Sequence, residues 1–133
     1  MKIKKIKAAF IPYYKDQVLV ALSSNPMFGG PHFALCKGQI DEGETVEQAA
    51  IREAEEELGL RQSNLAGPVK HLGNFSTFGY ILSVYFAEVK DPDAFNLPCW
   101  EIAETKWMTW QEFRSVGREQ HRPIVDSFFQ QLT

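Results

Sequence analysis

Four glutamates within five positions form a dense set of ionisable side chains: Glu53, Glu55, Glu56 and Glu57. The stretch around them has the composition of a helix, with no glycine or proline between residues 45 and 58. Like charges three or four residues apart on a helix repel by roughly 0.2–0.5 kcal/mol per pair, and acidic groups near the helix C-terminus also oppose its dipole. Such an arrangement requires compensation, and a bound cation is one way to supply it.

The spacing of three of these glutamates brings their carboxylates together. At about 100° per residue, Glu53, Glu56 and Glu57 fall within roughly a 100° arc of the helix. Ala49 and Ala50 precede them on that face, and their small size is expected to let a loop or a ligand approach. The opposite side is expected to face the core and carries Ile51, Ala54 and Leu58.

Three carboxylates at positions i, i+3 and i+4 form a hard oxygen site of the kind that Mg²⁺ and Mn²⁺ prefer. A solvated acidic face is the alternative, and charge composition alone favours it. The preceding residues favour the metal site, because Gly38, Gly43 and Glu44 form a predicted compact turn that lets backbone groups approach an ion or a phosphate. Lys37, next to Gly38, is a candidate phosphate contact.

Residues 38–60 resemble the signature of the Nudix hydrolase family. That signature reads Gly, five residues, Glu, seven residues, Arg-Glu, an apolar residue, any residue, Glu-Glu, any residue, Gly and an apolar residue. At that spacing the chain supplies Gly38, Glu44, Arg52, Glu53, Ala54, Glu56, Glu57, Gly59 and Leu60. The resemblance extends more weakly to "GGPHFALCKGQIDEGE" and "EIAETKWMTWQEF", with Cys36 where a proline is common.

The resemblance implies an α/β (α+β) fold of the Nudix type, an α/β/α sandwich with a central mixed sheet, formed by residues 1–133 as a single domain. It also implies a hydrolase that uses Mg²⁺ or Mn²⁺ to cleave a diphosphate bond in a small-molecule nucleotide. Bound metal stabilises charge on phosphate oxygens and lowers the pKa of bound water. The expected reaction is attack of water on one phosphorus.

Site roles follow from the resemblance, position by position. Glu56 and Glu57 match the main metal ligands, and Gly38 would add its carbonyl. Glu53 matches a residue that binds metal or activates the attacking water. Arg52 is expected to orient the carboxylates, and Glu44 to support the loop and assist the base.

A further metal ligand is expected from a loop outside the signature. Glu101 stands six residues before Trp107, a spacing similar to that in diadenosine polyphosphate hydrolases, and Glu104 is the alternative. That spacing and "SVYFAEVKDPD" predict a dinucleoside polyphosphate or a nucleoside triphosphate as substrate. Loop aromatics that offer a stacking surface for a base are Phe28, Phe33, Phe95 and Trp100, with Phe33 taken as substrate-binding. The three histidines, His32, His71 and His121, are expected to be ordinary surface or core residues.

Two other functions stay open. The first is a nucleotide-sensing module that keeps the fold without turnover, although the intact set of carboxylates argues against it. The second is a diphosphate isomerase, which requires further acid–base groups such as a catalytic cysteine, and Cys36 lies just before the signature.

Bulk properties narrow the setting of this chemistry. A formal net charge of −3 argues against extended nucleic-acid binding. Cys36 and Cys99 lack metal-ligand spacing and suit free thiols. The sequence contains no apolar run of membrane-spanning length and no signal-peptide pattern. We expect a cytoplasmic protein without membrane contact, and the sequence leaves a homodimer open.

The elements that position the glutamates can be read from periodicity and breakers. Thr45 and Gln48 predict a capping box at the start of the helix 45–58, and Gly59 predicts its end. Predicted strands are 3–14 and 17–24, joined by a turn at Tyr14-Lys15-Asp16, then 69–78 and 80–89 around Gly79, and 105–110. Predicted loops are 25–33 and 91–98, and closing helices are predicted at 110–116 and 121–132.

Overall fold

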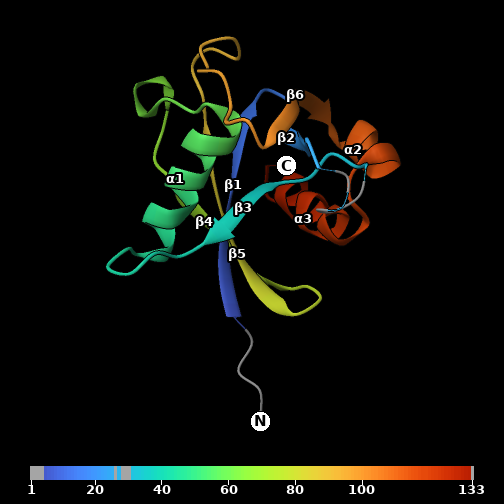
Figure 1. Cartoon of the computed structure of the whole chain (residues 1–133). Coiled ribbons are helices and arrows are strands. Elements are labelled where there is room, and N and C mark those ends of the chain that lie inside the picture. Colours follow the sequence, from blue (N-terminus) through green and yellow to red (C-terminus); the bar gives the residue numbers. More distant parts are fainter. Residues whose placement is uncertain (1–4, 26, 28–30, 133) are drawn as a thin grey trace.

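The computed structural model describes residues 5–25, 27 and 31–132 (Figure 1). The strands are β1 (Lys5–Tyr14), β2 (Gln17–Ser23), β3 (Cys36–Gln39), β4 (Lys70–Ser76), β5 (Tyr80–Glu88) and β6 (Ile102–Thr109). The helices are α1 (Val46–Leu58), α2 (Trp110–Val116) and α3 (Arg122–Leu132), with short 3₁₀ turns η1 (Gln62–Asn64) and η2 (Glu119–His121). No helix of these described residues is long and apolar enough to cross a membrane.

Strand β1 is the centre of a mixed sheet. The strand order is β4-β5-β1-β2-β6, with β3 also paired to β1. The β1–β5 pair is parallel, from Lys5 opposite Tyr80 to Tyr13 opposite Glu88, whereas the other pairs are antiparallel. Consecutive β1 residues Ala8, Ala9, Phe10 and Ile11 are all fully buried, as expected for a strand covered on both faces.

The period-two alternation of β1 divides the core into two layers. Ala9 and Ile11 pack into a cluster with side chains of α2 and α3, whereas Ala8 and Phe10 pack into a second cluster with α1. Figure 1 shows α1 on one side of the sheet and α2 with α3 on the other. The predicted α/β/α sandwich with a central mixed sheet is therefore confirmed.

Helix α1 begins and ends where its sequence predicts. The Thr45 side chain accepts a hydrogen bond from the backbone of Gln48, and the Gln48 side chain accepts one from the backbone of Thr45. Gly59 ends the helix in the left-handed conformation, with φ 76°. The expectation that Ala49 and Ala50 leave space for a ligand is wrong, because both are fully buried in the core layer between α1 and the sheet.

Two other predictions are corrected by the sheet. Gly38 was expected in a compact turn but lies in β3, opposite Ala8 of β1. The late strand is longer than predicted, since β6 begins at Ile102 and pairs with β2 up to its bulge at Leu22 and Ser23. Both hairpins and the two closing helices are confirmed. The predicted loop 25–33 lies partly, and Phe28 wholly, outside the described residues.

Candidate active site

Arg52 supplies part of the compensation that the glutamate cluster requires. Its guanidinium donates two hydrogen bonds to the Glu44 carboxylate, at 2.8 and 3.0 Å, and one to Glu53 Oε1 at 2.9 Å. It also donates to the carbonyl of Gln39 at 2.9 Å and lies 3.5 Å from Glu56. The bonds from Arg52 lower the pKa of Glu44, which therefore stays ionised and fixes the guanidinium in turn.

Glu53 and Glu57 form a close carboxyl pair one helical turn apart on α1. Glu53 is only 8% exposed, and burial raises its pKa despite the opposing hydrogen bond from Arg52. Burial and the charge of Glu53 raise the pKa of Glu57 to about 7. Two carboxyl groups that hinder each other's ionisation in this way favour the binding of a cation or a proton between them.

Gly38 is required at its position by close approach to Glu53. A Cβ atom placed on Gly38 would lie 2.1 Å from both Cδ and Oε1 of the Glu53 carboxyl group. The backbone of Gly38 is not in the left-handed region, unlike that of Gly43, where φ is 84°. The glycine of β3 therefore opens room for a carboxylate, whereas the glycine of the following turn provides a backbone conformation.

The oxygen donors on α1 suit a hard divalent cation in type, although they do not all converge. The described residues contain no group of three or more His, Cys, Asp or Glu side chains arranged to hold a metal ion. Glu53 and Glu57 lie together beside β3, whereas the Glu56 side chain is 52% exposed and leans toward Arg52. Carboxylate oxygens are the ligand type that Mg²⁺ and Mn²⁺ prefer, and two of them, from Glu53 and Glu57, lie together here.

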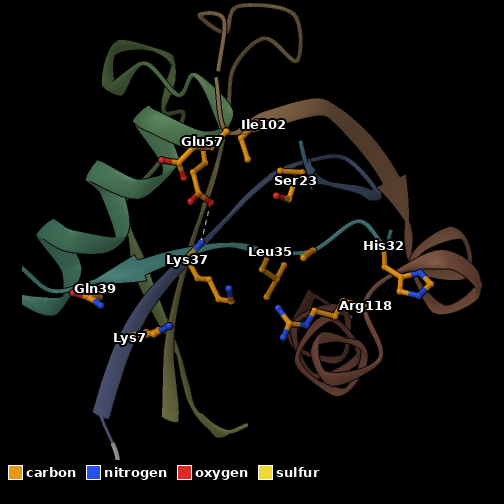
Figure 2. A pocket seen from close by; sticks show the side chains of 12 residues that line it. Lys7, Ser23, His32, Leu35, Lys37, Gln39, Glu57, Ile102 and Arg118 are labelled. Carbon is orange, nitrogen blue, oxygen red and sulfur yellow. Dashed lines mark hydrogen bonds between the residues drawn. The ribbon is translucent and has the colours of Figure 1, made fainter. Parts of the chain in front are cut away.

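A pocket of about 440 Å³ adjoins this carboxyl pair. Glu57 and Glu101 contribute negative charge to its lining, and Lys7, Lys37 and Arg118 contribute positive charge. Figure 2 shows Glu57 reaching in from α1 and Arg118 from the opposite side, with Lys37 between them. The backbone N–H of Lys37 donates to Glu57 Oε1 at 3.2 Å, which ties the middle of the pocket to the carboxyl pair.

The pocket includes some of the residues predicted outside the helix. Lys37 lines it, and burial followed by the nearby charge of Arg118 lowers the Lys37 pKa. Glu101 also lines it, and its charge contributes to the raised pKa of Glu57. Glu104 is exposed on β6 and is not part of this lining.

The aromatic side chains predicted to offer a stacking surface for a base lie in different surroundings. Phe33 does not line the pocket and packs against the core layer of α2 and α3, so the structure does not place its ring as a substrate contact. Phe95 packs edge-on against the ring of Trp107, with centroids 5.8 Å apart. Trp100 is 85% exposed.

Cys36 is unsuited to acid–base catalysis. Its thiol is buried and donates to the carbonyl of Phe10 at 3.2 Å. Burial, together with the charge of Glu57, raises its pKa well above the ordinary value. The isomerase alternative loses its candidate thiol.

Sequence reasoning found Lys37 but missed the other two basic residues of the pocket, Lys7 and Arg118. Lys7 lies in β1, and Arg118 follows α2, so no local spacing links either of them to Lys37. His121, treated as an ordinary residue, is fully buried, and its Nδ1 accepts a hydrogen bond from the backbone of Leu35 at 3.1 Å. Only the alternation of Lys7 with apolar β1 residues hinted that its side chain emerges from the sheet.

Comparisons with known proteins agree with the fold. A family model for the NUDIX domain matches residues 4–129, and the chain therefore belongs to the Nudix hydrolase family. It is 36% identical over 92 residues to the putative mutator protein MutT4 of Mycobacterium tuberculosis, covering 62% of this chain and 35% of that protein. It is also 36% identical over 86 residues to the NAD-capped RNA hydrolase NudC of the same species, covering 63% of this chain and 26% of that protein. The matches thus span about a third and a quarter of these curated relatives.

Solved structures share the fold over most of the chain. The binary complex of the Caenorhabditis elegans Ap4A hydrolase superposes with a TM-score of 0.76 at 24% identity, covering 95% of this chain and 97% of that one. The NUDIX domain of Shewanella oneidensis NrtR complexed with ADP ribose gives a TM-score of 0.74 at 19% identity, covering 100% and 91%. At these identities the likeness concerns the fold alone.

Proposed function

We propose that this protein is a metal-dependent pyrophosphohydrolase that cleaves a diphosphate bond in a nucleoside diphosphate derivative. The observation that carries the proposal is the Glu53–Glu57 carboxyl pair, of which Glu57 lines a pocket that Lys37 also lines. One cavity thus combines oxygen ligands for a cation with a positive charge for phosphate oxygens.

The residues that would hold Mg²⁺ or Mn²⁺ are Glu53, Glu56, Glu57 and Glu101, together with the carbonyl of Gly38. Glu101 and Glu57 line the same pocket, which supports Glu101 over Glu104 as the ligand from the late loop. When bound, the metal neutralises charge on phosphate oxygens and makes bound water more acidic.

The chain's own groups prepare the attack on phosphorus. Glu53 accepts the proton of the attacking water, and its raised pKa suits a general base that works near neutral pH. Arg52 holds Glu53 in one orientation, and Glu44 holds Arg52 through its two hydrogen bonds. Lys37 binds an oxygen of the phosphate group.

The substrate proposed is a dinucleoside polyphosphate or a nucleoside triphosphate. The pocket volume of about 440 Å³ lies in the usual range for small-molecule sites. Support for the dinucleoside class comes from "SVYFAEVKDPD" and from the spacing of Glu101 and Trp107, which resemble diadenosine polyphosphate hydrolases. The NrtR domain is complexed with ADP ribose, so the panel of compounds to be tested must include it.

A turnover assay tests this function directly. The protein is incubated with Mg²⁺ or Mn²⁺ and diadenosine tetraphosphate, nucleoside triphosphates, ADP-ribose or coenzyme A, and the nucleotide products are separated and identified. We expect asymmetric cleavage of the dinucleotide into a monophosphate and a triphosphate, or pyrophosphate release from a triphosphate. Tight nucleotide binding without turnover, under either metal, would instead support the sensing module.

Metal binding has its own measurement. A cation that binds only the folded state stabilises it, by about 2.7 kcal/mol at a hundredfold excess over Kd. We therefore expect millimolar Mg²⁺ to raise the melting temperature, and an unchanged melting temperature with and without nucleotide counts against the metal site.

A cytoplasmic location is proposed as well, supported by the free thiols of Cys36 and Cys99.

A further inference from the structure

Arg118 lies across the pocket from Glu57 (Figure 2). It lines the pocket from the segment between α2 and η2 (Figure 2). Among the described residues, no carboxylate lies within ion-pair distance of its guanidinium, and the same holds for the ammonium of Lys37. Lys7, at the same pocket, rests over the ring of Tyr80 at 4.5 Å.

The backbone that carries Arg118 is held firmly against the segment that carries Lys37. Phe33 and Gly117 form a parallel bridge, and the backbone N–H of Arg118 donates to the carbonyl of Phe33 at 2.7 Å. Three residues on, buried His121 accepts from the backbone of Leu35 at 3.1 Å. The two segments therefore form one support, and it anchors the backbone of Arg118 at the pocket wall.

His121 keeps this support free of a further charge. Burial, together with the charges of Arg118 and Lys37, lowers the His121 pKa to about 3. Its Nδ1 accepts a hydrogen bond, so the hydrogen of the neutral ring is on Nε2. Because the His121 ring is neutral, the segments that carry Lys37 and Arg118 pack together without burying an additional positive charge.

Unpaired cations on a shared wall repel one another unless an anion lies between them. The carboxylates of Glu57 and Glu101 line the same pocket, but under the proposed function they hold the metal. The wall of Lys7, Lys37 and Arg118 is therefore available to the ligand. A planar guanidinium binds phosphate oxygens through two parallel hydrogen bonds, which makes Arg118 the strongest phosphate ligand on this wall.

We propose that Arg118, beside Lys37, forms an anion subsite that binds phosphate groups beyond the diphosphate being hydrolysed, whereas Lys37 contacts that diphosphate itself. The inference rests on the proposed function, and it sharpens the substrate class to nucleotides with a chain of three or more phosphates. Arg118 acts in this subsite as a specificity-determining residue from outside the signature segment.

A binding experiment without metal tests the subsite apart from catalysis. Inorganic tripolyphosphate is titrated calorimetrically in EDTA into the wild type, Arg118→Gln, Arg118→Lys and Arg114→Gln. Arg114 is the matched control, because it lies on α2, 3.9 Å from Asp126, and outside this pocket, so its replacement changes the net charge equally. Melting temperatures of all four proteins confirm that they fold.

We expect Arg118→Gln to weaken tripolyphosphate binding about tenfold or more, Arg118→Lys to weaken it less, and Arg114→Gln to leave it unchanged. Equal losses in Arg118→Gln and Arg114→Gln would show a general charge effect and overturn the subsite. Absence of tripolyphosphate binding by the wild type would overturn it too.

A kinetic comparison tests the assignment to chain length. For Arg118→Gln, we expect KM for diadenosine tetraphosphate to rise about tenfold with little change in kcat, whereas KM for ADP-ribose stays near the wild-type value. Equal changes for both substrates would overturn the chain-length role. If no nucleotide is hydrolysed but Arg118→Gln still loses tripolyphosphate binding, the proposed function fails and the anion subsite stands.

Discussion

The acidic and basic sides of the pocket differ in how their charged groups are paired. On the acidic side, Glu44 and Glu53 are tied to one guanidinium by hydrogen bonds of 2.8 to 3.0 Å, and the whole network comes from one stretch of chain. On the basic side, Lys37 and Arg118 come from distant segments and have no carboxylate partner among the described residues. Internal pairing fixes groups for chemistry, whereas unpaired charge is kept available for a ligand.

Removing the proposed base should have the largest effect and should leave the basic side intact. Glu53→Gln keeps the shape of the side chain but removes the proposed proton acceptor and one negative charge. We expect turnover to fall by about 10²-fold or more, roughly the contribution of a general base. Steady-state kinetics measures the fall, and nucleotide binding should persist. Near-normal turnover would transfer the role to another carboxylate, with Glu44 the next candidate.

Gly38→Ala should disturb the acidic side by displacing the Glu53 carboxyl group, whereas Glu53→Gln removes its charge. The new Cβ would meet the Glu53 carboxyl at 2.1 Å, and the flexible end of that side chain must then move away. A misplacement of about 1 Å at a catalytic group can cost on the order of 10²-fold in rate. We expect a loss of that order in kcat with a nearly unchanged melting temperature. Gly67→Ala is the matched control, because a Cβ there meets nothing within 4 Å.

Substitutions of Glu101 and Glu104 should have a smaller effect, and they identify which of the two binds the metal. Glu101 lines the pocket beside Glu57, whereas Glu104 is exposed on β6. Glu101→Gln should raise the Mg²⁺ concentration for half-maximal activity several-fold, roughly the loss of one ligand from a shared site. Glu104→Gln should leave it unchanged. The opposite pattern assigns the ligand to Glu104, and no change in either variant means that water and substrate phosphates complete the site.

The pH dependence of stability should report the carboxyl pair with the smallest effect. In the folded protein the pKa of Glu57 is raised to about 7, above its ordinary value of 4.5, so folding retains a proton that the unfolded chain releases. This contribution to stability is complete below pH 4.5 and is lost as pH rises through 7. In EDTA, thermal unfolding should therefore show stability falling over this window by about 1 kcal/mol or more.

Glu57→Gln provides the control for that titration. The variant should show a flatter profile between pH 4.5 and 7, and added Mg²⁺ should raise the wild-type stability most above pH 7, where the proton has left. Parallel profiles for the wild type and the variant would mean that Glu57 does not titrate in this range.

The acidic side could be predicted because its geometry is local. Helix α1 is specified by Thr45, Gln48 and Gly59 acting on their immediate neighbours, and the helical repeat then places Glu53 and Glu57 side by side. Neither step requires knowledge of the rest of the chain. Conversely, Gly38 gave no strand signal, because the four residues of β3 are held in the sheet by pairing with β1.

Burial and the basic side were decided by tertiary structure. Ala49 and Ala50 belong to the core because α1 packs closely on the sheet, which helical periodicity alone did not resolve. Lys7, Lys37 and Arg118 meet only because β1 pairs with β3 and because His121 holds the segment after α2 against Leu35. The sequence by itself determined the helix, its caps and the side-by-side placement of Glu53 and Glu57. The tertiary structure alone decided which distant cations face those carboxylates, because long-range pairing leaves no spacing rule in the chain.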